Sequence, residues 1–129
     1  MLNMLKQGSE KMENKRPVDL QERTFLFAKE VRDFVKRLSR TICNFEDGRQ
    51  LVRSSGSVAA NFVEANEALS KKDFLMRIKI CRKEAKESQL WLRLIYEGTS
   101  GECPAAREAL IAEARELVLI FSSIISKKS

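Results

Sequence analysis

The spacing of apolar residues is the feature that most constrains how this chain of 129 residues can fold. From residue 19 onward, apolar or small side chains recur at alternating steps of three and four residues, which is the repeat of one face of an α-helix. Only two prolines are present, Pro17 and Pro104, and each stands where a helix would begin. The sequence therefore predicts an all-α chain.

Capping residues divide this pattern into four helices. Asp19 and Ser70 are natural N-cap residues, and each is followed three positions later by an acidic residue, as in a capping box. A break is expected at the sequence CNFEDG, and a turn at the sequence GTSGE. We expect the helices to cover about 19–42, about 47–68, 70 to about 98, and 104 onward. The apolar face of the first would end at Ile42, and that of the last would contain Leu110, Leu117, Ile120 and Ile124.

Apolar repeats of about 3.5 residues favour helices that cross at about 20°. We therefore expect an antiparallel up-down-up-down four-helix bundle over residues 18–127. Residues 1–17 are expected to form a flexible tail, and the sequence leaves open whether Met1 or Met12 is the native start. The helices carry more apolar side chains than one core needs, which predicts self-association. These additional residues are Phe25, Leu26, Ala28, Val35, Leu75, Ile80, Leu90, Trp91 and Leu94.

Missing residue types exclude most catalytic chemistry. The chain has no histidine, which removes Ser-His-Asp and Cys-His systems, histidine zinc sites and di-iron bundles. It has no glycine-rich phosphate loop. Cys43, Cys81 and Cys103 show no CxxC spacing, so we expect reduced, mostly buried cysteines of a cytoplasmic protein. No apolar run is long enough for a signal peptide or a membrane span, so we expect no membrane partner. Because the residue types of these catalytic and metal sites are missing, we also expect a non-enzymatic protein without cofactor or metal.

The stretch RSSGSVAANFVEAN, residues 53–66, breaks the apolar pattern inside the second expected helix. Its polar stripe, Arg53, Ser57, Asn61 and Glu64, lies on one helical face. A hairpin turning near residue 70 would place Arg53 close to Glu87 and Glu84, and Asn61 beside Ile78. Two interpretations remain open: an internal hydrogen-bond network that fixes helix register, or a subunit contact or ligand surface.

Basic residues gather in the first and third expected helices. Residues 70–98 carry eight basic and four acidic side chains, a net charge of +4. Such a surface is suited to a phosphate backbone. The alternative is an ordinary solvated face whose charges pair with acidic neighbours such as Glu64, Glu67 and Glu116. The candidate nucleic-acid-binding residues are Lys29, Arg32, Lys36, Arg40, Lys79, Arg82, Lys83, Lys86 and Arg93.

Two runs of residues carry a family resemblance. They are VDLQERTFLFAKEVRDFVKRL, residues 18–38, and QLVRSSGSVAANFVEANEALSKKDFLMRIKICRKEAKESQLWLRLI, residues 50–95. They resemble the four-helix-bundle family of reading frames found in intervening sequences of bacterial 23S rRNA genes. The resemblance implies an up-down bundle that assembles as a homopentameric ring. It also implies similarity to the accessory protein of diversity-generating retroelements, which binds nucleic acid and a reverse transcriptase.

Two functional hypotheses from different classes follow. The first is a non-enzymatic, ring-forming protein that binds RNA or DNA through its basic helix faces, in association with a ribosome or a retroelement. The second is a protein-interaction scaffold that captures a protein partner, such as a reverse transcriptase, through exposed apolar side chains. The sequence predicts no base-specific contacts, so any nucleic-acid binding is expected to act on backbone charge.

Overall fold

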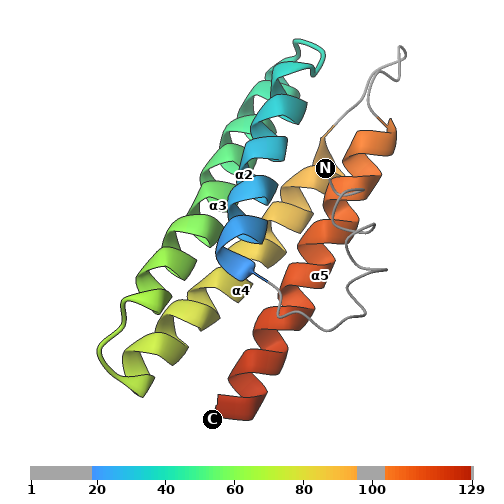
Figure 1. The fold of residues 1–129 in the computed structure, drawn as a ribbon. Helices are drawn as coiled ribbons and strands as arrows, with labels where there is room; N and C mark the ends of the chain where they lie inside the picture. Colours follow the sequence, from blue (N-terminus) through green and yellow to red (C-terminus); the bar gives the residue numbers. More distant parts are fainter. Residues whose placement is uncertain (1–18, 96–103, 129) are drawn as a thin grey trace.

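A computed structural model describes residues 19–95 and 104–128, which form four helices that run side by side (Figure 1). Consecutive helices run in opposite directions, so the expected all-α, up-down-up-down arrangement is confirmed. The expected N-terminal tail, the GTSGE turn and Cys103 lie outside the described residues. The four helices are α2 (Leu20–Lys36), α3 (Ile42–Asn66), α4 (Lys71–Leu94) and α5 (Pro104–Lys128).

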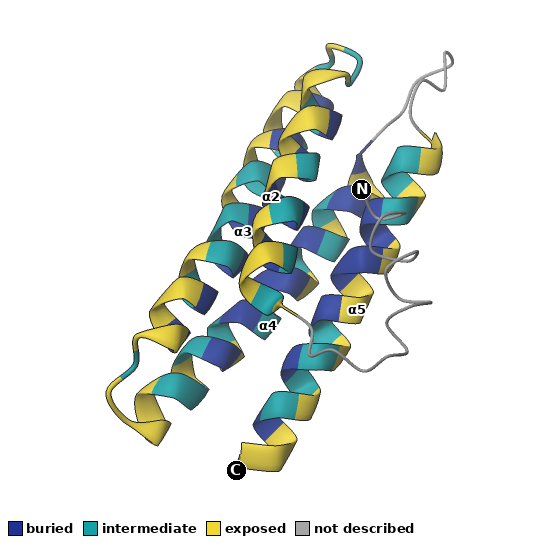
Figure 2. Cartoon of the chain, in the orientation of Figure 1, coloured by how far each residue is buried: buried dark blue, intermediate teal, exposed yellow. Residues whose placement is uncertain are grey.

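The helices pack unequally around the core. α3 and α4 form the most extensive pair, α5 packs on α4, and α2 packs on α3, whereas α2 and α5 touch over a much shorter stretch. α2 and α4 therefore occupy diagonal corners of the bundle, and their outer sides face away from each other. Figure 2 shows buried positions on the helix sides that face one another and exposed positions on the outer sides.

The core follows the predicted apolar faces closely in α2, α3 and α4. Fully buried residues include Phe27 and Phe34 of α2, Leu51 of α3, and Ile78 and Leu92 of α4. The buried face of α5 is rotated relative to the expected one, because Ile120 and Ile124 are only half-buried. The buried face of α5 instead consists of Leu110, Ile111, Glu113, Ala114, Leu117, Phe121 and Ile125.

The expected break at CNFEDG is wrong, because these residues belong to the first two turns of α3. The chain turns earlier, after the C-cap at Arg37, and Thr41 caps α3 by accepting a hydrogen bond from the Asn44 N–H at 3.0 Å. The buried Asn44 amide also donates to the Ser39 carbonyl at 3.1 Å. The expected first helix is therefore shorter, and Ile42, expected on its buried face, is 79% exposed.

Close packing of α2 against α3 accounts for the glycines inside α3. A Cβ at Gly48 would lie 3.2 Å from Cγ1 of Val35, and a Cβ at Gly56 would lie 3.0 Å from Nη2 of Arg32. Glycine inside a helix costs about 0.5–1 kcal/mol relative to alanine. At both positions this cost is offset by space for a side chain of α2.

The two described cysteines differ in environment. Cys43 is exposed, whereas Cys81 is fully buried and its thiol donates to the Val58 carbonyl at 3.5 Å. Burial raises the pKa of the Cys81 thiol to about 12, so this thiol stays protonated at neutral pH. The expectation of mostly buried cysteines therefore holds for Cys81 but not for Cys43.

The α3 cap provides a test of the revised helix boundary. We expect Thr41→Ala to lower the free energy of unfolding by about 1 kcal/mol, because it removes the acceptor for the Asn44 N–H. Asp47→Ala, at the start expected from the sequence, should cost less than about 0.5 kcal/mol. Urea denaturation followed by circular dichroism would measure both, and a larger loss in Asp47→Ala would contradict the boundary.

Candidate nucleic-acid interface

The outer side of α4 carries a row of cations. From Met76 to Leu94, every exposed residue of this helix is either basic or apolar. Five of the six exposed cations of α4, all except Lys71, recur at steps of seven, four, three and seven residues, so they share one helical face. At about 1.5 Å per residue the row extends over about 31 Å. We call it the α4 stripe: Lys72, Lys79, Lys83, Lys86 and Arg93.

Two of the three acidic residues of α4, Glu84 and Glu87, are held away from the α4 stripe, whereas exposed Asp73 lies in the first turn beside Lys72. Nη2 of Arg53, on α3, donates to Oε1 of Glu84 at 3.1 Å and to Oε1 of Glu87 at 2.9 Å. The Glu84 side chain is only 8% exposed. Both carboxylates bond to this guanidinium, and neither forms an ion pair with a cation of the α4 stripe.

Among residues 19–95 and 104–128, none of the nine predicted basic residues forms an ion pair with a carboxylate. The ion pairs in these ranges involve other cations: Arg23, Arg49, Arg53 and Arg107. The expected alternative, in which Glu64, Glu67 or Glu116 would use up the positive charge, is therefore not observed among the described residues. The positive charge of the α4 stripe remains available to an external anion.

The predicted residues of α4 do not all share one face. Lys79, Lys83, Lys86 and Arg93 lie in the α4 stripe, whereas Arg82 turns toward α5 and its Nη1 donates to Oγ of Ser122 at 3.4 Å. Sequence reasoning missed Lys72, which belongs to the α4 stripe. Its position seven residues before Lys79, two helical turns away, was the signal that would have found it.

The predicted basic residues of the first helix lie on a different side of the molecule. Lys29 and Lys36 are exposed on α2, diagonal to α4, and Arg40 is exposed in the connection to α3. Arg32 folds back on the protein, with its Nη1 donating to the Ala28 carbonyl at 2.9 Å. Exposed Asp33 interrupts this group of cations. One chain therefore does not join the two basic groups into a single patch.

The polar stripe of α3 is bonded within the chain along the α3–α4 contact. Nδ2 of Asn61 donates to the Ser57 carbonyl at 2.9 Å, and Nη1 of Arg77 donates to Oδ1 of Asn61 at 2.9 Å. Next to Arg53 in the sequence, the buried hydroxyl of Ser54 lies 2.7 Å from that of Ser88. Arg77 was missed because the expected hairpin register placed Ile78 beside Asn61. Glu64 is exposed near the end of α3.

A second group of charges joins α2 to α5. Arg23 binds Glu113 with two hydrogen bonds, 2.7 Å from Nε and 3.0 Å from Nη2, and the Glu113 side chain is 6% exposed. Nearby on α2, Oε2 of Glu30 is buried without a hydrogen-bond partner. Burial, followed by repulsion from Glu113 and Asp33, raises the pKa of Glu30. This contact therefore carries unfavourable negative charge at neutral pH.

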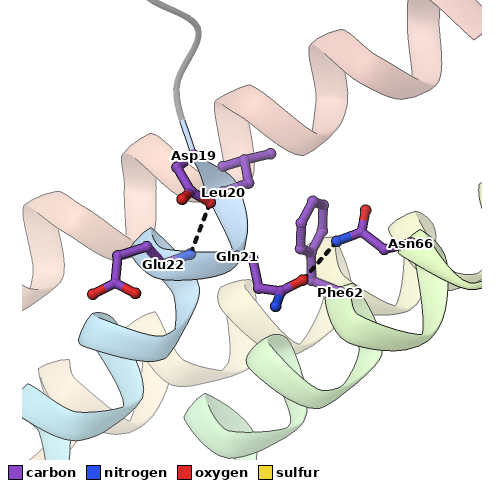
Figure 3. Close-up of a pocket in the computed structure, with 6 residues that line it drawn as sticks. All are labelled: Asp19, Leu20, Gln21, Glu22, Phe62 and Asn66. Atoms are coloured by element: carbon purple, nitrogen blue, oxygen red, sulfur yellow. Dashed lines mark hydrogen bonds between the residues drawn. The ribbon is translucent and has the colours of Figure 1, made fainter.

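Other features of the described residues suggest no catalytic site. An open hollow of ≈ 500 Å³ lies between the start of α2 and the end of α3 (Figure 3). Its polar groups bond to each other: Asn66 Nδ2 donates to Gln21 Oε1 at 2.8 Å, and Asp19 accepts from the Glu22 N–H. Within the described ranges, no three Cys, Asp or Glu residues cluster as metal ligands, and no helix is long and apolar enough to cross a membrane.

The Arg53 contacts predict an unequal response to removal of two arginines. We expect Arg53→Ala to lower the free energy of unfolding by about 1–2 kcal/mol, since it leaves the buried Glu84 carboxylate without its cation. Arg49→Ala is the matched control, because Arg49 pairs with Glu46 across an exposed contact worth less than about 1 kcal/mol. Chemical denaturation would measure the free energy of unfolding of both variants. Equal losses would show that the Arg53 contacts contribute little to stability.

The buried Glu30 oxygen predicts a pH-dependent gain in stability. A pKa that is raised on folding means that stability falls as pH rises from the unfolded value, about 4.3, through the folded value. Glu30→Gln should therefore raise the denaturation midpoint at pH 7, and the gain should vanish below about pH 4. Glu64→Gln, on an exposed position, is the control. Thermal denaturation at several pH values would measure the midpoint of both variants. A gain in Glu30→Gln that does not depend on pH would contradict the prediction.

Comparisons with known proteins agree with this architecture. A solved structure of a protein of unknown function, from the S23 ribosomal protein family of Bacteroides thetaiotaomicron, is similar with a TM-score of 0.69 and 26% sequence identity. The match covers 81% of this chain and 96% of that chain. A search of curated proteins returned no significant match. The family profile described as 23S rRNA-intervening sequence protein matches residues 16–120, and the chain therefore belongs to that family.

Proposed function

We propose that this protein is a non-enzymatic nucleic-acid-binding protein that contacts the phosphate backbone through the α4 stripe. One observation supports the proposal most strongly: five exposed cations line one side of α4, while Arg53 engages Glu84 and Glu87 of the same helix. The family description refers to 23S rRNA, which makes RNA the first ligand to test. A cytoplasmic location is part of this proposal.

The energetics of the α4 stripe support an anionic ligand. Lys79 and Lys83 are four residues apart and Lys83 and Lys86 are three apart, so each pair disfavours the helix by about 0.2–0.5 kcal/mol. A phosphate backbone relieves this repulsion and releases its own bound counterions. Binding through about five phosphate contacts would give a slope of about −4.5 in log affinity against log salt concentration.

Self-association is the second part of the proposal. Apolar side chains are also exposed on the helices that do not carry the α4 stripe: Phe25 on α2 is 52% exposed and Leu119 on α5 is 57% exposed. Burial of such side chains between copies is favourable by about 25 cal/mol per Å². Assembly into a homo-oligomer, a pentamer as the family resemblance implies, would repeat the α4 stripe around a ring and concentrate its positive potential.

The alternative function is a protein-interaction scaffold. It draws support from apolar side chains exposed at the helix ends: Leu69 is 97% exposed, Ile42 79% and Phe45 66%. Binding of a protein partner, such as a reverse transcriptase, through these residues would be tolerant of salt. Steep weakening by salt would instead favour nucleic acid.

Charge reversal on opposite sides of the bundle tests the proposed function. We expect the double variant Lys79→Glu/Lys86→Glu to weaken binding of a structured RNA at least tenfold in about 50 mM salt, measured by fluorescence anisotropy. Lys29→Glu/Lys36→Glu changes the net charge equally, but on the diagonal helix, and should weaken binding much less. Circular dichroism would verify that both variants keep their helices.

Two outcomes would contradict this proposal. Equal weakening by the two variants would show that overall charge, rather than the α4 stripe, attracts RNA. Failure of the unmodified protein to bind structured RNA at low salt would reject nucleic-acid binding altogether.

A further inference from the structure

We infer that the α4 stripe binds double-helical nucleic acid in preference to single strands, without reading the base sequence. This inference rests on the proposed function and narrows its ligand class. Three properties of the described residues support it: the position of the aromatic rings, the geometry of the cations, and their chemical type.

Aromatic rings are absent from the exposed face of the α4 stripe. Proteins that bind single strands stack bases on aromatic side chains, at about 1–3 kcal/mol per base. Among the described residues, the exposed rings are Phe25 on the diagonal helix α2 and Phe45 in the first turn of α3. Trp91 of α4 is half-buried against the core and its indole nitrogen is buried. Among residues 19–95 and 104–128, no fully exposed aromatic ring therefore lies beside the α4 stripe for bases to stack on.

The geometry of the cations favours a rigid polyanion. The α4 stripe fixes five positive charges along a single helix over about 31 Å. This length is close to one turn of a duplex, about 34 Å, along which B-form DNA presents a charge every 1.7 Å or so. A flexible single strand has a lower charge density, and it must lose conformational entropy to follow a straight row.

The chemical type of the cations predicts binding that is independent of sequence. Four of the five are lysines, which act as compact point charges on phosphates. Lysine and arginine can both contact guanine edges, but only the planar arginine, asparagine and glutamine side chains present two hydrogen-bonding groups in a fixed geometry, and Arg93 is the one such residue in the α4 stripe. Recognition of a duplex by backbone charge and shape is consistent with this composition.

A comparison of matched probes tests this inference. A 20-base-pair RNA duplex and an unstructured 20-nucleotide single strand would each be titrated with the full-length protein by fluorescence anisotropy in low salt. We expect the duplex to bind at least tenfold more tightly, and a duplex of shuffled sequence to bind equally well. Lys79→Glu/Lys86→Glu should reduce the preference for the duplex to less than threefold.

Two aromatic variants separate backbone binding from base stacking. Phe45→Ala removes an exposed ring near the end of the bundle, and Tyr96→Ala removes a ring that follows α4 in sequence, at a position outside the described residues. Neither should change affinity for either probe more than twofold.

Each contrary outcome has a distinct meaning. Equal or tighter binding of the single strand, or its weakening by Phe45→Ala or Tyr96→Ala, would overturn the duplex inference and leave nucleic-acid binding intact. A strong preference for one duplex sequence would overturn the claim that bases are not read. Failure of both probes to bind would reject the proposed function and this inference together.

Discussion

The distribution of charge in this protein depends on one guanidinium group. Arg53 of α3 holds Glu84 and Glu87 of α4 on the side of α4 that packs against α3. Beyond its first turn, where Asp73 is exposed, α4 thus has an acidic side that faces its neighbour and a basic side that faces solvent. Without this contact, Glu87 would be free to swing toward Lys83 or Lys86 and reduce the positive potential. The packing of one helix pair and the proposed binding surface are therefore linked by the same interaction.

The sequence predicted most of the fold because local signals agreed with the apolar repeat. Asp19 and Ser70 cap helices as expected, and the buried faces of α2, α3 and α4 follow the steps of three and four. The α2–α3 connection was misplaced because Gly48 and Asn44 are typical of loops, yet here both are buried inside a helix. Tertiary contacts, through Val35 for the glycine and Ser39 for the asparagine, outweighed local preference.

The candidate site was less predictable than the fold. Composition identified the basic helix, but the direction in which each cation points depends on the rotation of α4 between α3 and α5. A difference of about 100° between adjacent residues separates Arg82, which bonds to Ser122, from Lys83, which is exposed. Hairpin register, which one sequence gives only to within about a residue, decided whether Asn61 meets Ile78 or Arg77.

The unequal packing of the four helices determines which helix detaches most easily by local unfolding. α2 is joined to the bundle mainly through α3, and its short contact with α5 includes the unsatisfied Glu30 carboxylate. Detachment of α2 is therefore the least costly partial opening, and it would leave the α3–α4 hairpin with Arg53 and both of its carboxylates in place. Such a half-opened molecule would keep the α4 stripe in place while exposing fresh core to other chains. The proposed nucleic-acid ligand would then stay bound during this opening, which is the moment when exposed core makes aggregation most favourable.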